Sequence, residues 1–161
     1  MLHRLCISIL LLAPAFTLAC AGPSANRASA PLAAPAGSFR ANAAQTAEAM
    51  IGAPYRYGGS SPRGFDCSGL VIYSFARTGM SDLPHSATGL QGLARPVSLE
   101  EIEPGDLLFF RLGGRKASHV AIYVGGGAFV HAPSSGKRVE KVSLDHVYWG
   151  SRLGQAGRLE F

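Results

Sequence analysis

Three side chains of this sequence are of the types that carry out nucleophilic chemistry together: Cys67, His119 and His131. Cys67 follows Asp66, a favourable N-cap residue, and is therefore predicted to lie in the first turn of a helix. There the unpaired N–H groups and the positive end of the helix dipole lower the pKa of a thiol. A histidine within hydrogen-bond reach would take the thiol proton, and a third polar group would orient that histidine. The three residues predict a hydrolase in which Cys67 attacks a carbonyl carbon.

The two histidines lie on either side of the triple glycine Gly125 to Gly127, in segments typical of strands. Because side chains alternate along a strand, the length of the turn decides whether His119 and His131 face the same side. A three-residue turn would pair Val124 with Ala128 and make the histidines diagonal neighbours on one face, whereas a two-residue turn would separate them. We expect the three-residue turn, with His119 as the general base and His131 holding it in place.

The oxyanion formed by attack on a carbonyl needs hydrogen-bond donors. The backbone N–H of Cys67 is one, and a hydroxyl from the turn-rich loop over residues 55–64 would be a second. Tyr55 is the candidate, and Tyr57 is the alternative.

Helical and strand patterns follow one another along the chain in a simple order, with helices first and strands afterwards. An antiparallel sheet covered by N-terminal helices is the α+β arrangement, here with about five or six strands. The helices are predicted over 43–51 with Asn42 as N-cap, over 67–77 with Leu70, Val71, Ser74 and Phe75 facing inward, and over 86–94. The strands are predicted over 106–111, 118–124, 128–132, 137–142 and 157–161.

The first 19 residues are typical of a secretory signal peptide, because a short basic start is followed by an apolar run too short to span a membrane. The next residue, Cys20, ends the stretch Thr17-Leu18-Ala19-Cys20, which resembles the lipobox of bacterial lipoproteins, although Thr17 stands where leucine is usual. Lipidation of Cys20 is expected, and ordinary cleavage after Ala21 is the alternative. Residues 20–41 are rich in Ala, Pro and Ser and predict a tether, which leaves 42–161 as the folded domain.

Composition limits the protein to one domain, because 161 residues suffice for a single core and a short added segment. The net charge of +5 and a pI near 9.4 favour anionic partners, but charge alone does not distinguish nucleic acid, acidic lipid and cell-wall polymer. Of the 3 cysteines, Cys6 falls in the signal peptide and Cys20 at the processing site. Cys67 therefore has no disulfide partner within the domain, and its thiol is either buried and inert or retained for chemistry.

Five motifs, taken in order and spacing over residues 42–161, closely resemble the NlpC-type cell-wall endopeptidases. The resemblance implies a papain-like α+β fold, a Cys-His-His triad of Cys67, His119 and His131, a thioester acyl-enzyme, and Tyr55 as the oxyanion tyrosine. The relatives commonly carry arginine where this sequence has His85. A contact of that side chain near the cleft, such as one to a substrate carboxylate, is therefore not carried over to this sequence. The motifs are Tyr55-Arg56-Tyr57-Gly58-Gly59, Asp66-Cys67-Ser68-Gly69, Pro104-Gly105-Asp106-Leu107, Ser118-His119-Val120-Ala121-Ile122-Tyr123 and His131-Ala132-Pro133.

The expected substrate is peptidoglycan, cut in its stem or cross-link peptides at D-Ala–diaminopimelate or γ-D-Glu–diaminopimelate bonds. Ser68, Asp66, Ser118 and His85 are expected around that substrate, whereas Asp106 is interpreted as a turn or strand-start acid. No cofactor, metal or nucleic acid is expected. The protein is expected to be a monomer in the cell envelope, as a lipoprotein of the outer membrane that faces the periplasm or, failing lipidation, as a secreted or periplasmic protein.

Three alternatives remain open for the same residues. Cys67, His119 and His131 are acceptable zinc ligands, although no HExxH or paired CxxC motif accompanies them. The domain could bind the cell wall without cutting it. It could also be an amidase or acyltransferase on the same fold.

Overall fold

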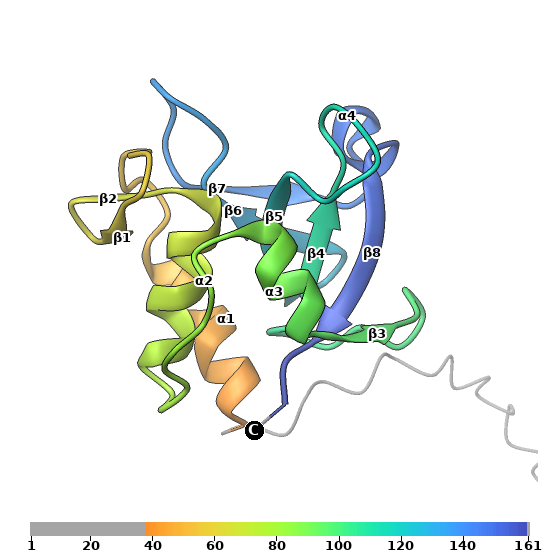
Figure 1. Cartoon of the computed structure of the whole chain (residues 1–161), viewed down its shortest axis with the longest axis horizontal. Helices are drawn as coiled ribbons and strands as arrows, with labels where there is room; N and C mark the ends of the chain where they lie inside the picture. Colours follow the sequence, from red (N-terminus) through yellow and green to blue (C-terminus); the bar gives the residue numbers. More distant parts are fainter. Residues whose placement is uncertain (1–37, 161) are drawn as a thin grey trace, which may run out of the picture.

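Residues 38–160 are described by a computed structural model, and the predicted signal peptide, Cys20 and most of the predicted tether lie outside them. Figure 1 shows α1 and α2 beside each other on one side of the sheet, with α4 at a distance from α1. The helices are α1 (Phe39–Ala49), α2 (Cys67–Ala76), α3 (Ala87–Leu93) and α4 (Val147–Gly150). The strands are β1 (Ser60–Ser61), β2 (Gly64–Phe65), β3 (Arg95–Val97), β4 (Leu107–Phe110), β5 (His119–Gly125), β6 (Ala128–His131), β7 (Glu140–Ser143) and β8 (Leu153–Arg158).

The sheet that positions the candidate site has six strands in the order β3-β8-β4-β5-β6-β7, and each neighbouring pair is antiparallel. This confirms the predicted α+β class and strand number. The hairpin of β1 and β2 is separate from this sheet. None of the helices in the described part of the chain is both long and apolar enough to cross a membrane.

Both faces of the central strands are buried, which gives the domain two apolar clusters. Along β4, Leu107 and Phe109 pack with residues of α1, α2 and α3, whereas Leu108 and Phe110 pack with Trp149 of α4. Strand side chains alternate between faces, so a fully apolar strand is the pattern of one that is covered on both sides. The same alternation continues through β5 and β6. It places His119, the first residue of β5, and His131, the last residue of β6, on the α4 face.

The first helix begins earlier than predicted. It starts at Phe39 with Ser38 as its N-cap, whose hydroxyl accepts a hydrogen bond from a first-turn N–H at 3.1 Å, and Asn42 lies inside the helix. The Phe39 ring packs against Phe75 of α2 at a centroid distance of 6.4 Å. This long-range contact fixes the first turn and could not be inferred locally. The last residues of the predicted tether, 38–41, consequently belong to the folded domain.

The second helix agrees with its prediction. Asp66 is the N-cap of α2 and its carboxylate accepts from the N–H of Gly69 at 2.7 Å. The four residues predicted to face inward are all buried: Leu70, Val71, Ser74 and Phe75. The third helix also agrees, because Ser86 is the N-cap of α3.

The hairpin of β5 and β6 differs from the prediction in its turn but not in its strands. Gly125 pairs with Ala128, so the turn has two residues, Gly126 and Gly127, with φ values of 60° and 71° that favour glycine. The predicted pairing of Val124 with Ala128 is therefore wrong. A β-bulge between residues 123 and 125 adds the missing residue and restores the expected register further along, where Tyr123 pairs with Phe129 and Ile122 with Val130.

Two predicted strands lie elsewhere, and both are placed by tertiary contacts. Residues 137–139 bind the segment before Tyr55 instead of the sheet, with Val139 donating to Ala53 at 2.8 Å, so β7 begins only at Glu140. The strand predicted over 157–161 is β8, four residues earlier, because its glycine-containing sequence carries no β-branched residue and shows no alternation. The short elements β1, β2, β3 and α4 were not predicted.

Candidate active site

Cys67 is the first residue of α2, as predicted, and the loop before β1 packs closely against this end of the helix. The N–H of Asp66 donates to the carbonyl of Gly59 at 3.0 Å, and its carboxylate accepts from the N–H of Gly58 at 2.8 Å. A Cβ on Gly69 would collide with the Gly59 carbonyl, so only glycine permits this approach. The Asp-Cys-Ser-Gly motif thus positions a thiol and the loop beside it.

A cleft of about 470 Å³ opens at Cys67. It contains the predicted nucleophile, the predicted oxyanion tyrosine and all four residues expected around the substrate. The Ser68 hydroxyl is buried and donates to Asp66 at 3.1 Å. Residues lining the cleft include Tyr55, Tyr57, Asp66, Cys67, Ser68, His85 and Ser118.

His119 and His131 contact each other directly, with Nε2 of His119 at 2.9 Å from Nδ1 of His131. Both side chains are buried, at 3% and 0% exposure, on the α4 face of the sheet. Burial lowers the pKa of His119 to about 4, and burial together with the charges of His119 and Lys137 lowers the pKa of His131 to about 3. At neutral pH the histidine pair is therefore uncharged. The predicted arrangement on one face is confirmed.

Trp149 covers the histidine pair and was not identified from the sequence. Its ring lies 5.1 Å from the His119 ring and 4.5 Å from the His131 ring between centroids, and Phe110 and Phe129 complete the apolar surroundings. This aromatic enclosure explains why burial dominates both histidine pKa values. The one available signal was that Trp149 is the only tryptophan of the chain, but the four-residue helix that carries it has no recognisable pattern.

The environment of the Cys67 thiol differs from the prediction. Burial raises its pKa, and the Asp66 carboxylate adds to this, whereas the backbone N–H groups of Val120, Ser68 and Cys67 only partly oppose the increase. The predicted lowering by the helix terminus is therefore outweighed. With a protonated thiol and neutral histidines, the resting site holds no thiolate and imidazolium pair.

Cys67 and His119 are brought to the same place, because the thiol faces the backbone N–H of the residue after His119, Val120. Among the contacts of the described residues, no hydrogen bond joins the thiol to the His119 ring. Such bonds in unliganded enzymes often form only when substrate is bound. His119 contacts His131 through its Nε2, so Nδ1 of His119 takes no part in the contact between the two rings.

Tyr55 is partly buried at the edge of the cleft. Burial raises the pKa of its phenol, and the nearby charges of Cys67 and Asp66 raise it further. Its backbone is fixed on two sides, since its N–H donates to the Lys137 carbonyl at 2.9 Å and it forms a β-bridge with Phe65. Tyr57, the alternative, is 89% exposed at the rim. Tyr55 thus keeps its hydroxyl protonated at neutral pH and lines the cleft at Cys67.

Asp66 is joined to His85, the residue that departs from the family pattern. Nε2 of His85 lies 3.0 Å from the Asp66 carboxylate. Burial alone would raise the pKa of Asp66, but hydrogen bonds from Gly69, His85 and Gly58 outweigh it and hold the pKa below its usual value. Asp66 is consequently ionised at neutral pH and already has partners before any substrate arrives.

His131 has one ring nitrogen left, and it faces Glu140 on the neighbouring strand. Nε2 of His131 is buried and lies 3.4 Å from the nearer oxygen of Glu140, the residue directly opposite it in the β6 and β7 register. Glu140 was not identified from the sequence, because no register was assigned to the strand predicted over 137–142.

Two other predicted positions are accounted for by local structure. Asp106 directly precedes β4, as expected, and is fully buried beside Arg158. His146 is an exposed N-cap of α4, whose Nδ1 accepts from the Tyr148 N–H at 3.2 Å. Over residues 38–160 no group of three His, Cys, Asp or Glu side chains has an arrangement that could hold a metal ion.

Comparison with known proteins agrees with this geometry. The family model described as the NlpC/P60 family matches residues 52–158. The chain is 47% identical over 104 residues to murein DD-endopeptidase MepH of Escherichia coli, covering 62% of this chain and 38% of MepH. It is 41% identical over 112 residues to the bifunctional muramidase/DL-endopeptidase CwlT of Bacillus subtilis, covering 68% of this chain and 33% of CwlT.

Among solved structures, the NlpC/p60 domain of the peptidoglycan hydrolase SagA superposes with a TM-score of 0.65 at 32% identity. The superposition covers 74% of this chain and 98% of the SagA domain. The relatives MepH and CwlT are much longer than the part that they share with this chain. The family match contains the cysteine and both histidines and extends over most of the described residues, so the chain belongs to the NlpC/P60 family.

Proposed function

We propose that this protein is a cysteine endopeptidase that cleaves peptide bonds of peptidoglycan. The observation that carries the proposal is the buried pair of His119 and His131, joined at 2.9 Å, beside a thiol at the start of a helix. The names of MepH and CwlT, both endopeptidases, support the same reaction.

The proton that leaves Cys67 is received by Nδ1 of His119. This nitrogen must then be unprotonated, so Nε2 of His119 carries the hydrogen and donates it to Nδ1 of His131. The hydrogen of His131 consequently lies on its Nε2, which faces Glu140 at 3.4 Å. Glu140 is thus a positioning residue that fixes the tautomers of both rings.

Attack by the thiolate sulfur on the carbonyl carbon forms a tetrahedral oxyanion, which the Cys67 N–H and the Tyr55 hydroxyl stabilise. The carbon–nitrogen bond then breaks, and His119 gives its proton to the departing amine. Water attacks the resulting thioester while His119 takes a proton from that water. The carbon–sulfur bond then breaks and His119 returns the proton to the sulfur, which leaves the free acid as product and Cys67 as the thiol. Because neither the Cys67 thiol nor the His119 ring is charged at rest, the thiol loses its proton as the sulfur attacks.

We also propose a location, which the signal-peptide and lipobox patterns of the sequence support. In this proposal the protein is exported, retained at the outer membrane by lipid on Cys20, and active as a monomer on the periplasmic side. A Cys20→Ala variant is expected to move from the membrane fraction to the soluble periplasmic fraction. An unchanged distribution would contradict the lipid anchor and leave the peptidase proposal intact.

The test of the reaction is mass spectrometry of muropeptides from purified peptidoglycan after incubation with the wild type and with Cys67→Ala. New peptide termini are expected with the wild type only, and treatment with a chelator should not abolish them. Equal products from both proteins, or none from either, would overturn the peptidase proposal. Binding to peptidoglycan without any product would support the alternative of a non-catalytic wall-binding protein.

A further inference from the structure

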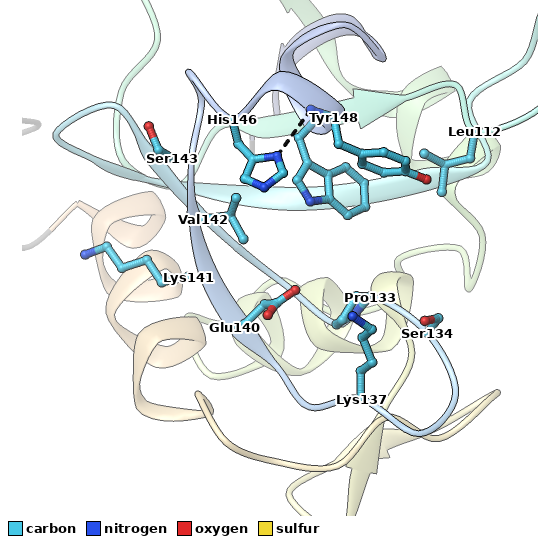
Figure 2. A pocket seen from close by; sticks show the side chains of 11 residues that line it. Leu112, Pro133, Ser134, Lys137, Glu140, Lys141, Val142, Ser143, His146 and Tyr148 are labelled. Atoms are coloured by element: carbon cyan, nitrogen blue, oxygen red, sulfur yellow. Dashed lines mark hydrogen bonds between the residues drawn. The ribbon is translucent and has the colours of Figure 1, made fainter.

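A second and larger cavity, of about 810 Å³, includes residues that contact the histidine pair among its lining, and Figure 2 shows the side chains that line it. Trp149, which covers both catalytic histidines, forms part of its wall, and so do Glu140 and Pro133, the second residue after His131. None of its lining residues is shared with the cleft at Cys67. The histidines themselves line neither space, but Glu140 and Trp149, which contact them, are in the wall of this cavity.

The chemistry of the proposed reaction assigns the two spaces to different parts of a substrate. The acyl part becomes bonded to Cys67 and remains in the cleft with Asp66 and Ser68. The departing amine must reach His119, which protonates it. The fragment attached to that amine consequently extends past the histidines, and the cavity beside them is the space available to it.

Two lysines line this cavity, and only one of them is paired. The ammonium of Lys141 lies 2.7 Å from the carboxylate of Glu48. The carboxylate of Glu140 faces His131, which is uncharged at neutral pH. Lys137 forms no side-chain ion pair or hydrogen bond within residues 38–160. Figure 2 shows its side chain extending from the loop after β6 toward Pro133.

The position of Lys137 is set by the site itself. Its backbone carbonyl accepts the hydrogen bond of Tyr55 at 2.9 Å, and its N–H donates to Ser134 at 3.1 Å. The charge of its ammonium is near enough to oppose protonation of His131. The Lys137 ammonium is thus an unpaired cation in the wall of the cavity, on the loop whose backbone also holds Tyr55.

We propose that Lys137 binds a carboxylate of the leaving fragment, carried by the carbon atom that bears the departing amine. This assignment rests on the proposed peptidase function. In a D-Ala–diaminopimelate cross-link that carbon bears a free carboxylate. In a γ-D-Glu–diaminopimelate bond of an intact stem, the corresponding carboxyl group is itself bound in an amide. Lys137 therefore directs the enzyme toward cross-links.

The experiment compares two synthetic cross-linked peptides that share the D-Ala–diaminopimelate bond and differ only at this carboxyl group, free in one and amidated in the other. The value of kcat/KM is measured for the wild type, Lys137→Met and Lys137→Arg. Lys116→Met is the matched control, because Lys116 also has no side-chain partner within the described residues and lines neither the cleft nor the cavity.

The wild type is expected to prefer the free carboxylate by about tenfold, the usual effect of one hydrogen bond to a charged group. Lys137→Met should lose this preference by lowering only the rate on the free carboxylate, Lys137→Arg should retain most of it, and Lys116→Met should retain all of it. The side chain of Lys137 is exposed, so melting temperatures should be unchanged.

An equal effect of Lys137→Met on both peptides, or no effect on either, would overturn the assignment while leaving the peptidase function standing. No cleavage of either peptide by the wild type, with stem peptides cut instead, would also overturn it. No cleavage of any muropeptide would show that the proposed function itself had failed.

Discussion

Two buried polar clusters lie at opposite ends of β4, and they treat charge in opposite ways. At its start, the fully buried Asp106 receives two hydrogen bonds from Arg158, at 2.8 and 2.7 Å. At its end, Phe110 pairs with His119, beside which lie the buried neutral histidine pair and the half-buried, protonated thiol of Cys67. In the cluster at Asp106 the buried groups are charged and paired with each other. In the cluster at His119 the groups are uncharged, so a proton can pass between them.

The difference shows how one small domain divides its functions. A buried ion pair is destabilising to break, because the partner that remains is left without compensation. A buried neutral imidazole is poised to accept a proton only when chemistry supplies one nearby. Substitutions at the Asp106 end should therefore change stability, and substitutions at the His119 end should change activity.

The largest effect is expected from His119→Gln. Loss of the general base and acid should lower kcat by roughly 10²–10⁴-fold, the usual contribution of such a group. Cleavage of the cross-linked peptide is the assay, and circular dichroism controls for folding. Activity within a few-fold of the wild type would show that another group takes the thiol proton.

Asp106→Ala tests the other cluster. Removing the carboxylate leaves Arg158 partly buried without its main partner and should lower the free energy of unfolding by about 3 kcal/mol. The rate per folded molecule should not change. Glu160→Ala is the matched control, because it breaks the exposed pair of Arg95 and Glu160 and should cost at most about 1 kcal/mol. Equal losses in urea titrations of the two variants would contradict the comparison.

The pH dependence of stability sharpens the contrast. The folded pKa values of His119 and His131, about 4 and about 3, lie below the ordinary 6.5. At pH values between the folded and the unfolded pKa, the unfolded chain therefore binds more protons than the folded one. Their contribution to stability is complete above pH 6.5 and is lost as the pH falls through about 4. His131→Gln should make the decline shallower. Melting temperatures measured between pH 7 and pH 4 are the test, and identical slopes for both proteins would count against burial as the cause.

The smallest effect is expected at the edge of the neutral cluster. Glu140→Ala removes the carboxylate that lies 3.4 Å from Nε2 of His131, a contact that is not a hydrogen bond in the unliganded site. If this contact tightens to a hydrogen bond during the reaction, its loss should lower kcat about tenfold. Glu140→Gln keeps an acceptor oxygen there and should retain more activity. If the two variants are equally active, the orientation of His131 does not depend on this side chain.

The residues of the candidate site can be predicted from the sequence better than the bounds of the helices and strands around it. Cys67, its N-cap Asp66 and the shared face of the histidines follow from local rules, because capping and alternation act over a few residues. The position of β8 and the earlier start of α1 depend on contacts with distant segments. The raised pKa of the Cys67 thiol was missed for the same reason, since burial is a property of the folded molecule.

The hairpin of β5 and β6 shows that a wrong prediction of the turn can still give the correct facing of the two histidines. Strand alternation requires an odd number of residues between the paired positions near the histidines. The protein meets that requirement with a two-residue turn and a bulge before Gly125, whereas the simplest solution from sequence was a three-residue turn. The sequence constrains the facing of the side chains more strongly than the detail of the turn.

The contact of Trp149 with His119 and His131 makes the chain's only indole an optical probe of the histidine pair. A protonated imidazole quenches the fluorescence of a neighbouring indole, whereas a neutral one does so far less. The emission intensity of this one residue should therefore follow the protonation of the histidine pair, with no label attached to the protein.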